Sequence, residues 1–334
     1  MRRRHALLIP ALLALAAAAA VGCRAMDKSE IEARLLALPK NAPVAALGLT
    51  RSTLSLEVDG EVRTLELVRY GLGEPRVVLV HGTPGSLFTW SELVFGSDGA
   101  PGLGADLGVL ALDVVGHGIQ PDTLDPLSFQ RAADFVGAAL EALDLSGVCL
   151  VGHSYGGEFV WRAALDHPER VSEVVLIDSA GYPRRDDEWL PEERKMRDWS
   201  IATWGWLFNS RERIRSALQP HFSEPVSDER LEEMYLACNH RGNWRAMVQL
   251  ARDENGTRSG ELKQLPQRTL LLWGANDIAY PIERFARQFE RDIPDARLQL
   301  IEGAGHYAHE ERPAAVAAAI RAFLLAPADL EGGD

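Results

Sequence analysis

A pentapeptide of the form Gly-x-Ser-x-Gly, at residues 152–156, limits the possible fold of this chain more than any other part of its sequence. It directly follows the apolar run Val148–Val151, which has the length and composition of a buried strand, and it precedes a helical pattern. In so tight a turn, side chains at the two flanking positions would collide with the strand and the helix. The glycines therefore predict a strand–turn–helix unit that holds Ser154 in a strained, exposed position.

Apolar segments of strand length alternate with helical segments along most of the chain. Five strands are predicted, followed by a weaker sixth one: Val77–Val80, Val109–Leu112, Val148–Val151, Val174–Ile177, Thr269–Trp273 and Arg297–Ile301. Helices are predicted most clearly at Phe129–Leu143 and Pro313–Leu325. Uninterrupted apolar strands are buried on both faces, and alternation with helices is typical of parallel sheets with right-handed crossovers. The predicted fold class is α/β with a mostly parallel, doubly wound sheet, preceded by a hairpin over Thr53–Val68.

The interval from Ala180 to Pro266 interrupts this alternation. It has several helical segments, no predicted strand, and five of the eight tryptophans: Trp189, Trp199, Trp204, Trp206 and Trp244. We interpret it as an inserted helical lid, whose tryptophans either contact a substrate or pack the lid onto the core. The predicted organisation is a signal peptide at 1–22, a tether with one short helix at 23–49, the core at 50–181 and 266–326, the lid at 182–265 and a tail at 327–334.

The first residues are typical of an export signal. Arg2–Arg4 precede an apolar run, Ala6–Val21, that is short for a membrane span. The segment Ala20-Val21-Gly22-Cys23 resembles the lipobox of bacterial lipoproteins, in which the cysteine is lipidated and becomes the first residue of the mature chain. This resemblance implies an exported protein anchored to a membrane through Cys23, at the outer membrane in a Gram-negative cell. The alternatives are a plain secretory signal or an uncleaved anchor.

A serine hydroxyl is a weak nucleophile until a base removes its proton. Where a serine lies on a turn of this kind, the acid and then the histidine follow it along the chain. His306 lies in the glycine-rich segment 302–306, just past the last predicted strand, whereas His221 and His240 fall in the lid. His306 is therefore the predicted base for Ser154.

An acid must hold the imidazole in one tautomer and stabilise its positive form. Asp277 follows the strand that ends at Trp273, which is the predicted strand before the histidine, and it is the predicted acid. The rival is Asp178, at the end of the strand before the lid, which otherwise serves as a turn or capping residue.

The loop after Val77–Val80 is predicted to stabilise a developing oxyanion. It reads His81-Gly82-Thr83-Pro84-Gly85-Ser86, and the backbone N–H groups of Thr83 and Tyr155 are the predicted donors. We expect His81 to fix this loop by a hydrogen bond. Asp113 and His117 are likewise expected to shape a loop.

Taken together, these residues resemble the α/β-hydrolase superfamily from about Thr53 to Leu325. The segment His81–Gly85 is similar to that of epoxide hydrolases and haloalkane dehalogenases, which carry an aspartate as nucleophile. Because Ser154 stands there, the resemblance implies instead a carboxylesterase, a lactonase, a carbon–carbon bond hydrolase or a proline iminopeptidase. Iminopeptidases usually have a second glycine where this chain has Thr83.

The predicted function is hydrolysis of a small, fairly apolar carboxylic ester or lactone through an acyl-enzyme. The other possibility is a binding protein that keeps the site without using it. A net charge of −13 with no basic stripe argues against a nucleic-acid partner. We expect no metal or cofactor, because ligand spacings and nucleotide-binding glycine motifs are missing, and we expect Cys149 and Cys238 to pack as apolar residues. The oligomeric state stays open.

Overall fold

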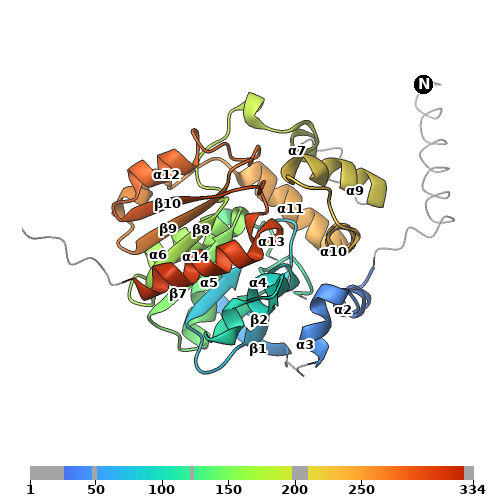
Figure 1. Ribbon diagram of the computed structural model, residues 1–334, viewed down its shortest axis with the longest axis horizontal. Coiled ribbons are helices and arrows are strands. Elements are labelled where there is room, and N and C mark those ends of the chain that lie inside the picture. The colour runs from blue at the N-terminus through green and yellow to red at the C-terminus, as the bar shows by residue number, and fades with distance from the viewer. Residues whose placement is uncertain (1–25, 47–50, 121–123, 198–209, 327–334) are drawn as a thin grey trace, which may run out of the picture.

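The computed structural model describes residues 26–46, 51–120, 124–197 and 210–326, and it places an 8-stranded sheet at the centre (Figure 1). The strand order is β1-β2-β6-β3-β7-β8-β9-β10. The strands span Arg51–Val58 (β1), Glu61–Tyr70 (β2), Val77–Val80 (β3), Val109–Leu112 (β6), Val148–His153 (β7), Val171–Ile177 (β8), Arg268–Gly274 (β9) and Ala296–Ile301 (β10). From β6 to β10 neighbouring strands are parallel, whereas β2 is antiparallel to both β1 and β6. The mostly parallel sheet expected from the sequence is confirmed.

Two apolar cores lie on opposite faces of this sheet, because successive side chains of a strand point to opposite faces. In β3, Val78 and Val80 contribute to one core and Val77 and Leu79 to the other. The helices on the first face are Phe129–Ala142 (α5), Tyr155–Asp166 (α6) and Ala286–Asp292 (α12). The helices on the second face are Lys28–Leu36 (α2), Ala42–Ala46 (α3), Ser91–Phe95 (α4), Ala308–Glu311 (α13) and Pro313–Leu325 (α14). Helices thus cover both faces, as uninterrupted apolar strands require.

A helical insertion lies between β8 and β9, where the lid was expected. Its described helices are Pro191–Met196 (α7), Arg211–Leu218 (α9), Asp228–Cys238 (α10) and Arg241–Asp253 (α11), and no strand occurs in the described part of the interval 180–266. These helices share an apolar cluster of their own, which includes Met234, Trp244 and Met247. Trp199, Trp204 and Trp206 lie outside the described residues.

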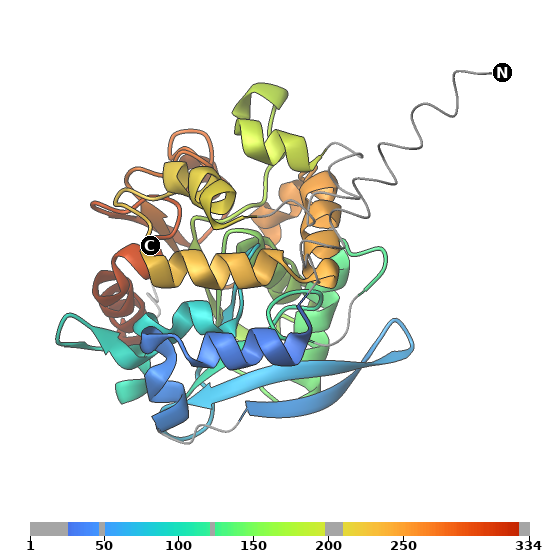
Figure 2. The same cartoon turned by 90° about the vertical axis from the view of Figure 1, so that its right-hand side faces the viewer.

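The segment expected to be a tether is folded wherever it is described. Helix α2 begins after Asp27, whose side chain accepts the N–H of Glu30, and it lies alongside α10 of the lid (Figure 2). Ile31 and Leu35, one helical turn apart, are buried in the core of the second face. Residues 28–46 are therefore a structural part of the fold rather than a spacer.

Three cationic side chains of this N-terminal segment contact the lid. Arg34 pairs with Glu232 and Lys40 with Glu233, both on α10. The Nζ of Lys28 donates to the side chain of Asn243 on α11 at 2.5 Å and to the backbone oxygen of Gly118 in the core at 2.8 Å. Burial lowers the pKa of Lys28 to about 8. The N-terminal segment therefore joins the lid to the core.

Residues 1–25 lie outside the described part of the chain, and with them the predicted signal and Cys23. Among the described residues, no helix is both long enough and apolar enough to cross a membrane.

Candidate active site

The turn between β7 and α6 has the tight geometry that its glycines predict. Ser154 adopts φ 54° and ψ −122°, a conformation that side chains rarely occupy. A Cβ on Gly152 would lie 2.3 Å from the backbone oxygen of Gly156, and a Cβ on Gly156 would lie 2.4 Å from the oxygen of His81. Only glycine fits at either position, and the turn holds Ser154 at the carboxyl end of β7.

Ser154, His306 and Asp277 form a continuous hydrogen-bonded chain. The Oγ of Ser154 lies 3.0 Å from the Nε2 of His306, and the Nδ1 of His306 lies 3.0 Å from the Oδ2 of Asp277. An ionised carboxylate only accepts hydrogen bonds, so Nδ1 carries the imidazole proton and Nε2 is free to accept the serine proton. The backbone N–H groups of Ala279 and Tyr280 donate to the other oxygen of Asp277 and fix its orientation. This arrangement has the geometry needed to activate a serine hydroxyl.

Asp178, the rival acid, has a different place in the structure. It is fully buried, and its carboxylate accepts the backbone N–H of Gly274 at 2.7 Å and that of Ala308 at 3.2 Å. Burial, and then the nearby charge of Asp277, raise the pKa of Asp178 well above its ordinary value. Asp178 thus joins the two loops that carry Asp277 and His306, and its hydrogen bonds go to their backbone rather than to the imidazole.

The loop after β3 approaches the serine turn closely. A Cβ on Gly82 would lie 2.8 Å from the Cβ of Ser154, so the backbone that leads into Thr83 passes directly beside the serine. Tyr155 is the first residue of α6, and its N–H precedes the helix's own hydrogen-bond ladder. Thr83 and Tyr155 both line the same cavity as Ser154. The structure therefore brings both predicted oxyanion residues to the serine.

Side chains behind this loop fix it. The backbone N–H of Val114 donates to His81, and the carboxylate of Asp113 accepts the N–H groups of Leu87 and Ile119. These contacts agree with the loop-shaping roles expected for His81 and Asp113.

His117 contacts the side chain of Thr83, one of the two predicted oxyanion residues. Its Nε2 lies 2.6 Å from the Oγ1 of Thr83, and its Nδ1 lies 3.2 Å from the oxygen of Val115. Burial, and then the neighbouring His81, lower the pKa of His117 to about 3, so the ring is neutral. Nδ1 therefore donates to the backbone oxygen of Val115, and Nε2 accepts the hydroxyl proton of Thr83.

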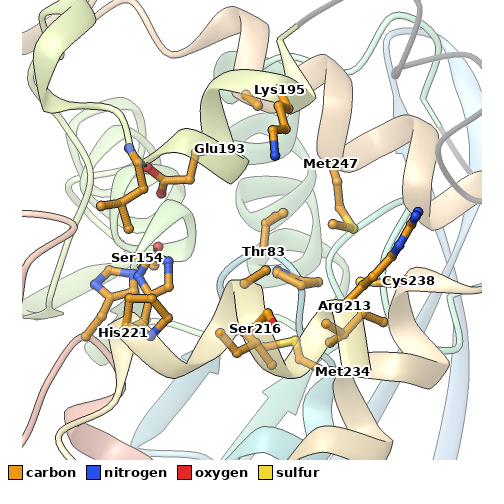
Figure 3. Close-up of a pocket in the computed structure, with 18 of the residues that line it drawn as sticks. Thr83, Ser154, Glu193, Lys195, Arg213, Ser216, His221, Met234, Cys238 and Met247 are labelled. Carbon is orange, nitrogen blue, oxygen red and sulfur yellow. Dashed lines mark hydrogen bonds between the residues drawn. The ribbon is translucent and has the colours of Figure 1, made fainter. Parts of the chain in front are cut away.

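The site opens into a cavity of about 1010 Å³ between the core and the lid (Figure 3). Its walls come from Thr83, Ser154, Tyr155, Tyr280 and His306 of the core, and from helices α7, α9, α10 and α11 of the lid. Trp189 and Trp244, two of the five lid tryptophans, line it. The lid therefore lies over the carboxyl ends of β3, β7 and β10.

A buried polar network connects the lid to the residues around the serine. Glu254, at the end of α11, accepts the hydroxyl protons of Tyr155 at 2.6 Å and Tyr280 at 2.9 Å. Arg184 donates to the same carboxylate at 3.0 Å and to Glu193 at 3.0 Å. Burial, followed by the charge of Glu254, raises the pKa of Tyr155 well above its ordinary value. Both tyrosines are therefore protonated donors at neutral pH.

Several residues that support the site were not predicted from the sequence. His153 donates from Nε2 to the backbone oxygen of His306 at 2.8 Å, and Glu311 accepts the N–H groups of Gly305 and Ser223, both at 2.7 Å. In the lid, His221 lines the cavity with its ring 5.8 Å from that of His306. Burial and the neighbouring His306 lower the pKa of His221 to about 3. The position of His153 inside the pentapeptide was the one available clue.

Cys149 and Cys238 are both buried, each within an apolar cluster, as expected. Within the described ranges, no cluster of three or more histidine, cysteine or acidic side chains is arranged to hold a metal ion.

The fold agrees with comparisons to known proteins. The model of the alpha/beta hydrolase family matches residues 77–319, and the chain belongs to this family. Esterase YbfF of Escherichia coli (strain K12) is 28% identical over 254 residues, which cover 74% of this chain and 92% of the esterase. The 2-hydroxymuconate semialdehyde hydrolase of Pseudomonas sp. (strain CF600) is 29% identical over 266 residues, which cover 76% and 88% of the two chains.

A solved structure shows the same fold. A thermophilic esterase from Thermogutta terrifontis matches with a TM-score of 0.66 at 24% identity, over 82% of this chain and 98% of the esterase. The α/β-hydrolase fold expected from the sequence is thereby confirmed, and the relatives include esterases and other hydrolases.

Proposed function

We propose that this protein hydrolyses carboxylic esters through an acyl-enzyme formed on Ser154. The observation that carries this proposal is the hydrogen-bonded chain from Ser154 through His306 to Asp277, with 3.0 Å at each step. In the proposal, Ser154 is the nucleophile, His306 the general base and Asp277 the acid that orients it. The backbone N–H groups of Thr83 and Tyr155 stabilise the oxyanion.

The proposed reaction has two halves that use the same groups. The Oγ of Ser154 attacks the ester carbonyl while Nε2 of His306 takes its proton, and negative charge develops on the carbonyl oxygen beside Thr83 and Tyr155. The protonated imidazole, stabilised by Asp277, then gives its proton to the departing alcohol. In the second half, His306 removes a proton from water as the water attacks the acyl-enzyme, and it gives this proton to the Oγ of Ser154 as the acid departs.

The cavity supports an uncharged, largely apolar substrate. Ile214, Leu218, Met234 and Met247 line it, and the buried guanidinium of Arg184, which also lines it, is paired with the buried carboxylate of Glu254. The other charged side chains that line the cavity are of both signs: Glu193, Lys195, Glu212 and Arg213. A small, fairly apolar ester or lactone therefore fits the proposal.

A second candidate is carbon–carbon bond hydrolysis, which the relationship to 2-hydroxymuconate semialdehyde hydrolase favours. The same serine and histidine would serve there. Purified protein assayed with p-nitrophenyl esters and with 2-hydroxymuconate semialdehyde separates the two, because the preferred substrate has the higher kcat/KM.

The experiment that tests the proposed mechanism is Ser154→Ala. Turnover of p-nitrophenyl butanoate should fall by several orders of magnitude in a protein with an unchanged circular dichroism spectrum. Retained turnover would show that the reaction does not pass through Ser154.

We also propose a cellular location for the protein, membrane-anchored after export, which is supported by the sequence alone. Arg2–Arg4, the apolar run Ala6–Val21 and the lipobox-like segment that ends at Cys23 suit export and lipidation at Cys23. Two or more acyl chains would give stable membrane anchoring, whereas one gives marginal binding. Mass spectrometry of the mature N-terminus tests this: an unmodified Cys23, or cleavage at another bond, would indicate a plain signal or an anchor.

A further inference from the structure

The side chains that line the cavity differ between its two sides. In Figure 3, Ser154 and His221 lie at one side of the cavity, and Met234, Cys238 and Met247 lie at the other, with Thr83 between them. Figure 3 also shows Arg213 on the side away from the serine, but most of the lining there is apolar or sulfur-bearing and comes from α9, α10 and α11: Ile214, Leu218, Met234, Cys238, Trp244 and Met247. We call this part of the cavity the apolar arm.

The apolar arm is shielded from water, although it belongs to a cavity that remains open to the serine. Its six residues are all buried, and they belong to the apolar cluster of the lid. Lys195 and Arg213 also line the cavity, but both are exposed, so their charges are hydrated rather than enclosed with a ligand. An apolar group that binds in the arm is removed from water, which is favourable. No buried charged side chain loses its ion-pair partner when this happens.

The dimensions of the cavity exceed what a short ester needs. About 1010 Å³ lies at the upper end of the roughly 300–1,000 Å³ typical of sites for drug-sized ligands. A substrate with only a short acyl group would fill the catalytic end and leave the arm empty. The arm therefore indicates a longer substrate than the serine and histidine alone require.

The positions of the catalytic groups decide which end of an ester enters the arm. The departing alcohol must lie beside the Nε2 of His306, which donates its proton, and the carbonyl oxygen must lie beside Thr83 and Tyr155. His306 is on the His221 side of the cavity, where their rings are 5.8 Å apart. The arm lies on the opposite side of Thr83, so it is open to the remaining substituent of the carbonyl carbon, the acyl chain.

We infer that the apolar arm is an acyl-chain site and that the preferred substrates are esters of unbranched, medium-length fatty acids. This inference rests on the proposed function and names its substrate class. Two methionines at the end of the arm suit a flexible chain, because the unbranched thioether adjusts to irregular apolar shapes. Met234, Met247 and Cys238 form the wall that sets the length of the chain.

The test is the chain-length profile of hydrolysis for p-nitrophenyl esters from acetate to dodecanoate. For the wild type, kcat/KM should rise from acetate through butanoate to hexanoate by about fourfold per methylene, as expected from ~0.8 kcal/mol per buried CH₂. Each rate is divided by the acetate rate of the same variant, so that a general loss of folded protein cancels.

No hydrolysis of any ester by folded wild type would contradict the proposed function itself. A profile that is flat or highest at acetate would contradict the acyl-chain site alone.

Two variants should move this profile in opposite directions. Met247→Trp fills the arm and should lower the hexanoate-to-acetate ratio by about fifteenfold, the gain of two methylenes. Trp244→Ala enlarges the arm and should shift the optimum to a longer chain. Val248→Leu is the matched control, because Val248 is adjacent in α11 and buried in the same cluster but does not line the cavity. Its profile should follow the wild type. Unchanged ratios in both arm variants would overturn the inference.

A second ester series identifies which half of the substrate occupies the arm. Alkyl acetates with alcohols of increasing length keep the acyl group short and extend the other side. Met247→Trp should leave the length dependence of this series as in the wild type. If it depressed the long alkyl acetates instead, the arm would hold the alcohol, and the acyl-chain assignment would be wrong.

Discussion

The backbone oxygen of His221, in the lid, accepts a hydrogen bond of 2.7 Å from the backbone N–H of His306. A Cβ on Gly305 would lie 2.4 Å from the same oxygen, so the lid and the histidine loop are in direct backbone contact. The position of the proposed base therefore depends on the lid as well as on Asp277. Glu311 reinforces this contact, since its two carboxylate oxygens accept one N–H from each side, Gly305 and Ser223.

The first prediction concerns Glu311. Glu311→Ala leaves both N–H groups without their acceptor and loosens the loop that carries His306. We expect kcat for p-nitrophenyl butanoate to fall by about tenfold, equivalent to ~1.4 kcal/mol in the barrier. Glu311→Gln keeps one acceptor oxygen and should lose less. Equal activity of wild type and Glu311→Ala would show that the lid does not position the base.

The second prediction separates the two aspartates. Asp277→Asn presents the wrong hydrogen-bonding group to His306 and should lower kcat by about 10⁴-fold. Asp178→Asn should lower kcat far less and instead reduce the melting temperature, because Asp178 binds the backbone at Gly274 and Ala308. Kinetics and thermal unfolding of both purified variants check this. The reverse ranking of the two kcat values would move the acid to Asp178.

Sequence patterns could locate these two acids but could not assign Asp178 a role. The strands and the serine turn were predictable because they depend on local features: apolar runs, and glycines that leave room for the backbone. The partners of Asp178 lie 96 and 130 positions along the chain, and no local pattern reports so distant a contact. The apolar arm could not be predicted from the sequence for the same reason, since α9, α10 and α11 contribute to it jointly.

The segment predicted to be a tether has more structure, where it is described, than its local sequence pattern indicates. A short helix was foreseeable, but its packing was not. Ile31 and Leu35 look like a weak apolar stripe, and their burial depends on a sheet face formed by residues much farther along the chain. From the sequence, solvated surface charges are expected at Lys28, Arg34 and Lys40. Their partners belong to the lid, which is distant in the sequence.

The third prediction uses two truncations to test the role of this segment. A variant that lacks residues 1–25 should unfold at the same temperature as the full chain and keep its kcat/KM. A variant that lacks residues 1–46 exposes the core beneath Ile31, Leu35 and Val44, each worth about 1.5–3 kcal/mol when fully buried. It should melt at a markedly lower temperature and aggregate. Equal melting temperatures for the two truncations would mean that the segment is a tether after all.

The fourth prediction concerns acid stability and His309. This side chain is buried, and neither ring nitrogen makes a hydrogen bond among the described residues, with the carboxylate of Glu310 3.5 Å from Nε2. Burial, and then the charge of Arg230, lower the pKa of His309 well below its ordinary value. The unfolded chain therefore takes up this proton at a higher pH than the folded protein does, and the folded protein loses stability as the pH falls below about 6.5.

His309→Phe removes this titration and keeps a ring against His153 and Trp90, whose rings lie 4.3 and 4.5 Å away. Urea unfolding at pH 7 and pH 5 gives the loss of unfolding free energy for each protein. The loss should be smaller in the variant by about 2 kcal/mol, at ~1.4 kcal/mol per pH unit below 6.5. Identical losses would show that His309 is protonated in the folded state.

The central claim is that Ser154 is a nucleophile activated by His306. Mass spectrometry of the protein after reaction with a fluorophosphonate tests it most directly, because the reagent adds covalently to an activated serine. We expect one adduct, located on the peptide that contains Ser154, and no adduct on Ser154→Ala under the same conditions. A folded wild-type protein that stays unlabelled, or an adduct on another residue that persists in Ser154→Ala, would contradict it.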